Sequence, residues 1–176
     1  LSNGGTGEND KYVVYNYIEK VWYFGSLSRT AWMDRGLRTY PLAASAGYLY
    51  NHEFGEDDDG SAMTSFIESS QIDIADGEQF SLIRRVIPDF TFDGSSSNAP
   101  VVSLTLKARN APGGNYLQTQ SKDTTRTATT PVEQFTNVLN MRLRGRSFAM
   151  RVDSTDLGVR WKIGSPRVDL RQDGRR

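Results

Sequence analysis

The sequence predicts an all-β protein, and two observations support this prediction. Short segments with alternating apolar and polar residues recur along the chain, as in strands that bury one face. Helix signals are weak, because the one candidate capping sequence, Thr130 to Glu133, precedes only a brief apolar run. We therefore expect antiparallel sheets, with partial β-propeller blades followed by a β-sandwich-like domain, and at most one short helical turn at Thr130.

Two aromatic-rich hairpins are predicted near the start of the chain. In the first (11–25), a polar break separates two strands; in the second (40–53), Ala46 and Gly47 form a tight turn. Hairpins about 30 residues apart are typical of propeller blades, and a complete propeller needs at least four blades of about 40 to 50 residues. We therefore expect residues 1–60 to form one or two blades of a longer chain.

Residues 61–176 contain enough further strand-like segments for a two-layer sandwich. The predicted strands are 62–68, 80–87, 101–108, 139–144, 148–152, 159–163 and 168–171. The polar stretch 110–130 is predicted to be a long loop, and we expect it to act as an arm that docks on a neighbour.

The alternation of apolar and polar residues is clearest between residues 139 and 152. Between residues 139 and 144 the odd positions are apolar and the even positions are polar, with Arg142 and Arg144 on the polar face. From 148 to 152 the even positions are apolar instead. Because side chains alternate with a period of two, this change of parity requires a bulge or a turn, which Gly145 permits.

The formal net charge of zero conceals a charge difference along the chain. Residues 1–100 carry 15 acidic and 7 basic side chains, a net charge of −8, whereas residues 101–176 carry 6 acidic and 14 basic side chains, a net charge of +8. Three explanations are open. The halves neutralise each other within one molecule, the acidic part of one copy meets the basic part of the next in a ring, or the basic half contacts nucleic acid phosphates.

Groups that could catalyse a reaction are scarce. Cysteine is absent, His52 is the only histidine, and no G-x-S-x-G, phosphate-binding or dinucleotide-binding motif occurs. We therefore expect no enzymatic activity and no cofactor. No apolar run approaches the roughly 18 residues that span a bilayer, so no membrane insertion is expected.

Two sets of residues are candidates for binding. Asp57 and Asp59, which precede Gly60, form a weak candidate cation site, with a solvated hairpin tip as the other interpretation. The C-terminal region is dense in arginine, a residue enriched at protein interfaces, although a solvated sheet face would have the same pattern. The candidate interface residues are Arg142, Arg144, Arg146, Arg151, Arg175 and Arg176.

Several motifs, taken in order, carry a resemblance to a known family. They are Y-N-Y and W-Y in the first hairpin, Y-P-L-A-A-S-A-G-Y-L-Y-N-H-E, I-R-R-V-I-P-D-F, R-L-R-G-R, and G-V-R-W-K-I-G-S-P-R-V-D-L-R. This order is similar to the carboxy-terminal part of the tail nozzle, or packaged-DNA stabilisation, proteins of short-tailed phages.

The resemblance implies a structural virion protein of the phage tail, assembled in the host cytoplasm. It implies a homo-oligomeric ring, expected to be a hexamer, at the head-tail connector below the portal, with other tail and adaptor proteins as partners. Such a ring would retain packaged DNA, form part of its exit channel during ejection, and contact double-stranded DNA without sequence specificity.

Physical reasoning adds an expectation and an alternative. A channel wall that gripped DNA tightly would stall ejection, so we expect most arginines to face protein neighbours and the acidic half to lie nearer the lumen. The alternative is a carbohydrate-binding, receptor-binding tail module, in which exposed tryptophans and tyrosines stack on sugars.

Overall fold

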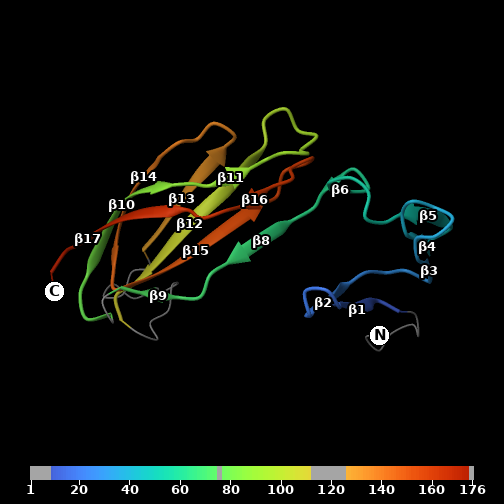
Figure 1. Cartoon of the computed structure of the whole chain (residues 1–176), viewed down its shortest axis with the longest axis horizontal. Coiled ribbons are helices and arrows are strands. Elements are labelled where there is room, and N and C mark those ends of the chain that lie inside the picture. The colour runs from blue at the N-terminus through green and yellow to red at the C-terminus, as the bar shows by residue number, and fades with distance from the viewer. Residues whose placement is uncertain (1–8, 75–76, 112–125, 175–176) are drawn as a thin grey trace. The chain divides into compact units, whose positions relative to one another are not determined.

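The computed structural model describes residues 9–74, 77–111 and 126–174, which form antiparallel β-sheets throughout (Figure 1). The described residues contain no α-helix, and therefore no helix that could cross a membrane. The predicted all-β class is confirmed. The chain divides into two compact units between Gly55 and Glu56, a few residues before the expected boundary at 60.

The first unit contains two small sheets. One pairs β1 (Lys11–Asn16) with β2 (Val21–Ser26), and the other has the order β3 (Ala31–Met33), β4 (Leu42–Ser45) and β5 (Tyr48–Asn51). Both predicted hairpins are present, whereas β3 was not predicted. A propeller blade has four strands, and these sheets have two and three, so the assignment to blades stays a prediction.

The turn between β4 and β5 shows how local sequence sets a hairpin. Ala46 and Gly47 both have positive φ, at 50° and 82°, and Ser45 pairs directly with Tyr48. Positive φ at both central residues defines the two-residue turn whose twist matches that of the flanking strands. The predicted turn position is therefore confirmed.

The second unit is a two-layer β-sandwich with two short ribbons. One layer has the strand order β14-β10-β17, and the other has the order β13-β12-β15-β8, with β9 also paired to β15; the ribbons are β6–β7 and β11–β16. The bounds are β6 (Asp57–Asp58), β7 (Ser61–Ala62), β8 (Ser65–Glu68), β9 (Ile72–Asp73), β10 (Ser81–Ile87), β11 (Phe90–Thr91), β12 (Val101–Arg109), β13 (Arg126–Glu133), β14 (Leu139–Gly145), β15 (Ser147–Ser154), β16 (Lys162–Ile163) and β17 (Arg167–Gln172).

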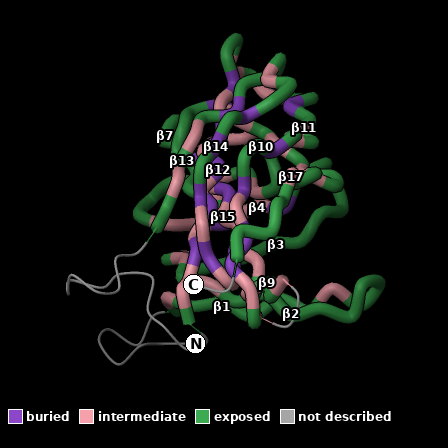
Figure 2. Tube along the Cα trace, turned by 90° about the vertical axis from the view of Figure 1, so that its left-hand side faces the viewer, coloured by how far each residue is buried: buried purple, intermediate pink, exposed green. Residues whose placement is uncertain are grey.

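The core of the second unit lies between the inner faces of the two layers. Buried positions alternate along β12 and β14, as Figure 2 shows in purple. Val86 from one layer and Leu104 and Val152 from the other are fully buried in the same cluster. Each such side chain contributes roughly 1.5–3 kcal/mol to folding, so this cluster holds the two layers together.

The parity change after residue 144 marks a crossing between the layers. β14 belongs to one layer and β15 to the other, with only Arg146 between them, so the chain turns rather than bulges. A Cβ atom at Gly145 would lie 2.8 Å from the Cβ of Ala108 and 3.0 Å from the carbonyl oxygen of Arg109. The amide of Arg146 donates to that same carbonyl at 2.8 Å. The corner therefore requires a residue without a side chain.

The predicted loop 110–130 and the predicted helical turn at Thr130 need correction. Residues 126–133 form strand β13, and residues 112–125 of the predicted arm lie outside the described residues. Val132 packs into the core, and the hydroxyls of Thr129 and Thr105 are 2.9 Å apart across the strand pair. Pro131 is tolerated because β13 is an edge strand, where one unpaired backbone position faces away from the sheet.

We expect Gly145→Ala to destabilise the protein by about 1–3 kcal/mol, because the new methyl group would collide with the backbone of Arg109. Gly36→Ala is the control, since a Cβ there meets nothing within 4 Å. Urea unfolding followed by circular dichroism measures both variants. Equal unfolding midpoints for the two would show that the corner is not tightly packed.

Candidate functional site

The outer face of the β14-β10-β17 layer is rich in arginine, and we name it the basic sheet face. Arg144 and Arg171 flank Leu82 across the sheet, while Ile83 and Val86 point into the core. The strands thereby gather residues that are far apart in sequence. The arginines of the basic sheet face are Arg84, Arg85, Arg142, Arg144, Arg167 and Arg171.

A β-bulge in the central strand adds to this positive charge. The register of β10 with both neighbouring strands shifts between Ile83 and Arg85, and both Arg84 and Arg85 are exposed. In a regular strand consecutive side chains would point to opposite faces. The bulge lets both arginines reach solvent without exposing Ile83 or Val86.

Two arginines of the basic sheet face have partners within the chain. Arg85 forms an ion pair with Asp169 at 3.2 Å. Arg144 donates from Nε to the Asp173 carboxylate and from Nη2 to the Asp173 carbonyl oxygen, at 3.1 Å, and its guanidinium lies 3.9 Å from the ring centre of Phe80. Arg144 is therefore held in place by several contacts.

The other four arginines of this face are exposed and have no ion-pair partner in the described part of the chain. Within the described residues, no hydrogen bond or ion pair joins Arg84, Arg142, Arg167 or Arg171 to another side chain. Four positive charges on one sheet face repel one another and attract an anionic partner.

Arg146 lies next to the basic sheet face, whereas Arg151 lies away from it. The guanidinium of Arg146 lies 4.8 Å from the ring centre of Phe80, at the corner between the layers. Arg151 lies on the outer face of the opposite layer, because the chain changes layers before β15. Arg175 and Arg176 lie outside the described residues. From the predicted set, the structure thus brings together Arg142, Arg144 and Arg146, the last two against the ring of Phe80.

Arg151 belongs to a charge network that ties β8, β12 and β15 together. Lys107 Nζ donates to Glu68 at 2.7 Å, and Arg151 donates to Glu68 at 3.0 Å and to Asp153 at 2.8 Å. Hydrogen bonds from Lys107, and then from Arg151, lower the pKa of the Glu68 carboxyl. Hydrogen bonds to Asp153 and then Glu68 raise the pKa of Arg151. The role of Arg151 at a subunit interface stays a prediction.

This network also bears on the charge difference along the sequence. Glu68 comes from the acidic half of the sequence, and both Lys107 and Arg151 come from the basic half. Each layer of the sandwich pairs strands from both halves, so part of the difference is neutralised inside one molecule.

The weak cation candidate has a structural partner. One carboxylate oxygen of Asp57 accepts a hydrogen bond from the amide of Gly158 at 2.6 Å, and Asp59 lies in the turn with φ of 49°. Within the described ranges, no group of three or more His, Asp or Glu side chains is placed to hold a metal ion. Asp57 therefore joins two loops, and cation binding there stays a prediction.

A second candidate surface lies in the first unit, on the first of the two aromatic-rich hairpins that the sequence predicts. Both faces of the β1–β2 hairpin are exposed, and Trp22 and Phe24 have 67% and 86% of their surface accessible. We name it the aromatic hairpin surface; it comprises Tyr12, Tyr15, Trp22, Tyr23 and Phe24. Among the described residues of the first unit, only Pro41 and Ala43 are buried. A two-stranded hairpin is marginally stable alone, and exposed apolar patches of this kind mark interaction sites.

The tryptophans and the histidine have different surroundings. Trp22 and Trp32 are exposed, whereas Trp161 packs against the core of the second unit and donates to the Ser65 hydroxyl at 2.9 Å. His52 accepts a hydrogen bond from Arg29 Nε at 3.0 Å, and its ring centre lies 4.8 Å from that of Trp32. These contacts give the histidine a structural role in the first unit.

No protein-family model matches the chain, and no curated protein matches it. The two candidate surfaces are therefore defined by the geometry of this chain.

The lowered pKa of Glu68 predicts a pH-dependent contribution to stability. A folded-state pKa below the unfolded value gives stability that is present above the unfolded pKa and is lost as the pH falls through the folded pKa. We expect Glu68→Gln to lower the unfolding free energy at pH 7 by about 0.5–1 kcal/mol, and to have less effect in acid. Urea unfolding over a pH series tests this, with the exposed Glu133→Gln as control. The same loss at every pH would exclude ionisation as the cause.

Proposed function

We propose that this chain is a structural component of a phage tail, which assembles with copies of itself and with neighbouring tail and adaptor proteins into a ring below the portal. The ring retains packaged DNA and forms part of its exit channel. In this proposal the protein acts through assembly and passive containment, without catalysing a reaction. The order of motifs supports the phage tail assignment, and the exposed surfaces support assembly.

The single observation that carries the proposal is the uncovered aromatic hairpin surface. The cross-strand rings of Tyr15 and Trp22 stack with centres 4.5 Å apart, yet both faces of the hairpin remain accessible to solvent. Burying a large apolar side chain contributes roughly 1.5–3 kcal/mol, so covering this surface stabilises a hairpin that is marginal alone. An assembly partner provides that cover.

The structure of the second unit is compatible with the proposed role in containing packaged DNA. Its two layers share a continuous core, and on the outer face of one layer the ion pairs of Lys107, Glu68 and Arg151 connect neighbouring strands. Such a packed sandwich deforms little, because protein interiors have the density of organic crystals. Passing DNA would slide along a wall that makes no sequence-specific contacts.

We expect the wild-type chain to form discrete rings. Trp22→Ser/Phe24→Ser should shift the equilibrium towards the monomer, because less apolar surface is then available to bury in the contact. Phe135→Ser is the matched control, since Phe135 is equally exposed but lies in the second unit. Light scattering after size exclusion and negative-stain images measure the assembly state. A wild-type chain that stays monomeric at high concentration would contradict the proposal.

The exposed Trp22 and Trp32 favour the second candidate, a carbohydrate-binding tail module. That function predicts binding of a defined glycan by a monomer or trimer, with at least tenfold weaker binding on Trp22→Ala or Trp32→Ala, because sugar rings stack on indole faces. A glycan array followed by titration calorimetry distinguishes the candidates. The structural proposal predicts no specific glycan and no effect of either substitution on glycan binding.

A further inference from the structure

Three loops of the second unit meet and carry a concentration of carboxylates. Gly158 donates its amide to Asp57 at 2.6 Å, and its carbonyl oxygen accepts from the amides of Ser96 and Ser97, both at 3.0 Å. These contacts join the β6–β7 turn to the loops 92–99 and 155–161. We name this region the acidic loop end; its carboxylates are Glu56, Asp57, Asp58, Asp59, Asp93 and Asp156, with Arg160 as the basic residue of the same loops.

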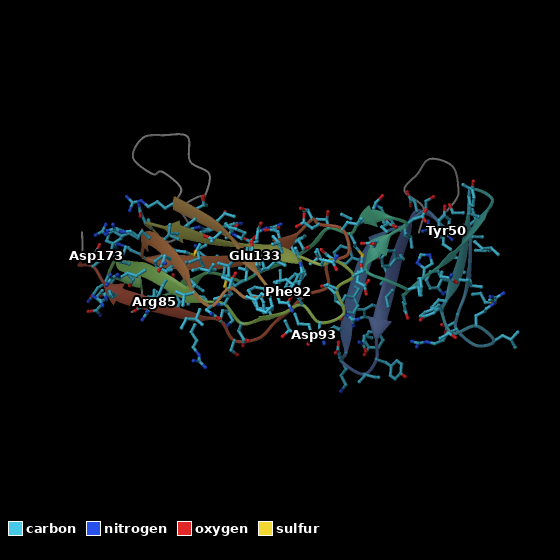
Figure 3. All side chains as sticks on the ribbon, turned by 90° about the horizontal axis from the view of Figure 1, so that it is seen from above. Tyr50, Arg85, Phe92, Asp93, Glu133 and Asp173 are labelled. Carbon is cyan, nitrogen blue, oxygen red and sulfur yellow. The ribbon has the colours of Figure 1, made fainter. Side chains whose placement is uncertain are left out.

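The acidic loop end and the basic sheet face belong to one folded unit and are separated along it. In Figure 3, Asp93 lies towards one end of the second unit, and Arg85 and Asp173 lie towards the other. No ion pair among the described residues joins the two regions. Part of the charge difference seen in the sequence therefore persists in space, within the second unit.

We infer that the acidic loop end of one copy docks on the basic sheet face of the next copy. This inference rests on the proposed assembly function and names the contact between neighbouring copies. The two surfaces differ, so the contact is head-to-tail, and repeating it closes a ring when the rotation between copies fits. Arg84, Arg142, Arg167 and Arg171 provide guanidinium groups that form paired hydrogen bonds with carboxylates.

The composition of the basic sheet face favours a protein partner over a nucleic acid. Asp169 and Asp173 lie among its arginines, and the acidic loop end, which carries Arg160 among its carboxylates, complements this mixture of charges better than the uniformly negative phosphates of a nucleic acid do. The acidic loop end has no counterpart in nucleic acid binding, because its charge has the sign of the phosphates. A second copy uses both surfaces at once.

Charge reversal with cross-rescue tests this contact. Arg142→Glu/Arg171→Glu cancels the net positive charge of the sheet face, and Asp58→Lys/Asp93→Lys removes most of the net negative charge of the loop end; all four residues are exposed. We expect each double variant to associate about 100-fold more weakly than wild type, or roughly tenfold for each lost pair. Arg35→Glu/Arg38→Glu, which reverses two exposed cations of the first unit, is the control and should assemble as wild type does.

Mixing the two double variants is the decisive measurement. In an equimolar mixture, the unchanged loop end of one variant meets the unchanged sheet face of the other, and the two altered surfaces meet with their charges exchanged. The mixture should therefore assemble, with copies alternating around an even-membered ring. Mass photometry measures this at about 50 mM salt and again at about 500 mM, where screening should weaken association of the wild type. Circular dichroism of each variant confirms that the sandwich is folded.

The outcomes separate this inference from the proposed function. The wild type could form rings while both double variants also form them, or while the mixture stays unassembled. Either result would overturn the head-to-tail contact but not the proposed ring. A wild-type monomer would overturn both. Loss of random-sequence duplex DNA binding in Arg142→Glu/Arg171→Glu, with assembly unchanged, would assign the basic sheet face to phosphate binding and overturn the inference.

Discussion

Packing of the two inner sheet faces against each other is the interaction on which the rest of this structure depends. Val86, Leu104 and Val152 belong to one shared core. Their burial determines which residues of each strand face inward and which face outward. The outer faces follow from this choice, because side chains alternate along each strand. Surface charge is therefore placed by the apolar pattern.

The fold was largely predictable where that pattern is local. The hairpins, the long strands other than β13, and the parity change near Gly145 follow from alternation and turn chemistry within short windows. Strand β13 was missed because threonines dominate it and Pro131 suggests an interruption, although Ala128 and Val132 alternate correctly for a strand. The short strands β3, β9 and β11 have too few residues to give a period.

The candidate surfaces were less predictable, because they depend on which strands become neighbours. Arg142 and Arg144 were selected from their own strand, but the arginines beside them come from β10 and β17, and local sequence does not reveal these pairings. Arg151 was grouped with them because it is close in sequence, yet the layer crossing sends it to the opposite side of the sandwich. The sequence predicts the aromatic hairpin, but alternation does not reveal whether another part of the same unit packs against its faces. In the structure, both faces are exposed.

The position of β17 has a consequence for the timing of biogenesis. This strand is synthesised after every other described strand, and it pairs with β10, which is made much earlier. Pairings between such distant segments form late and slowly during folding. Because β17 supplies Arg167 and Arg171, the basic sheet face is complete only after this strand has been synthesised and has paired with β10.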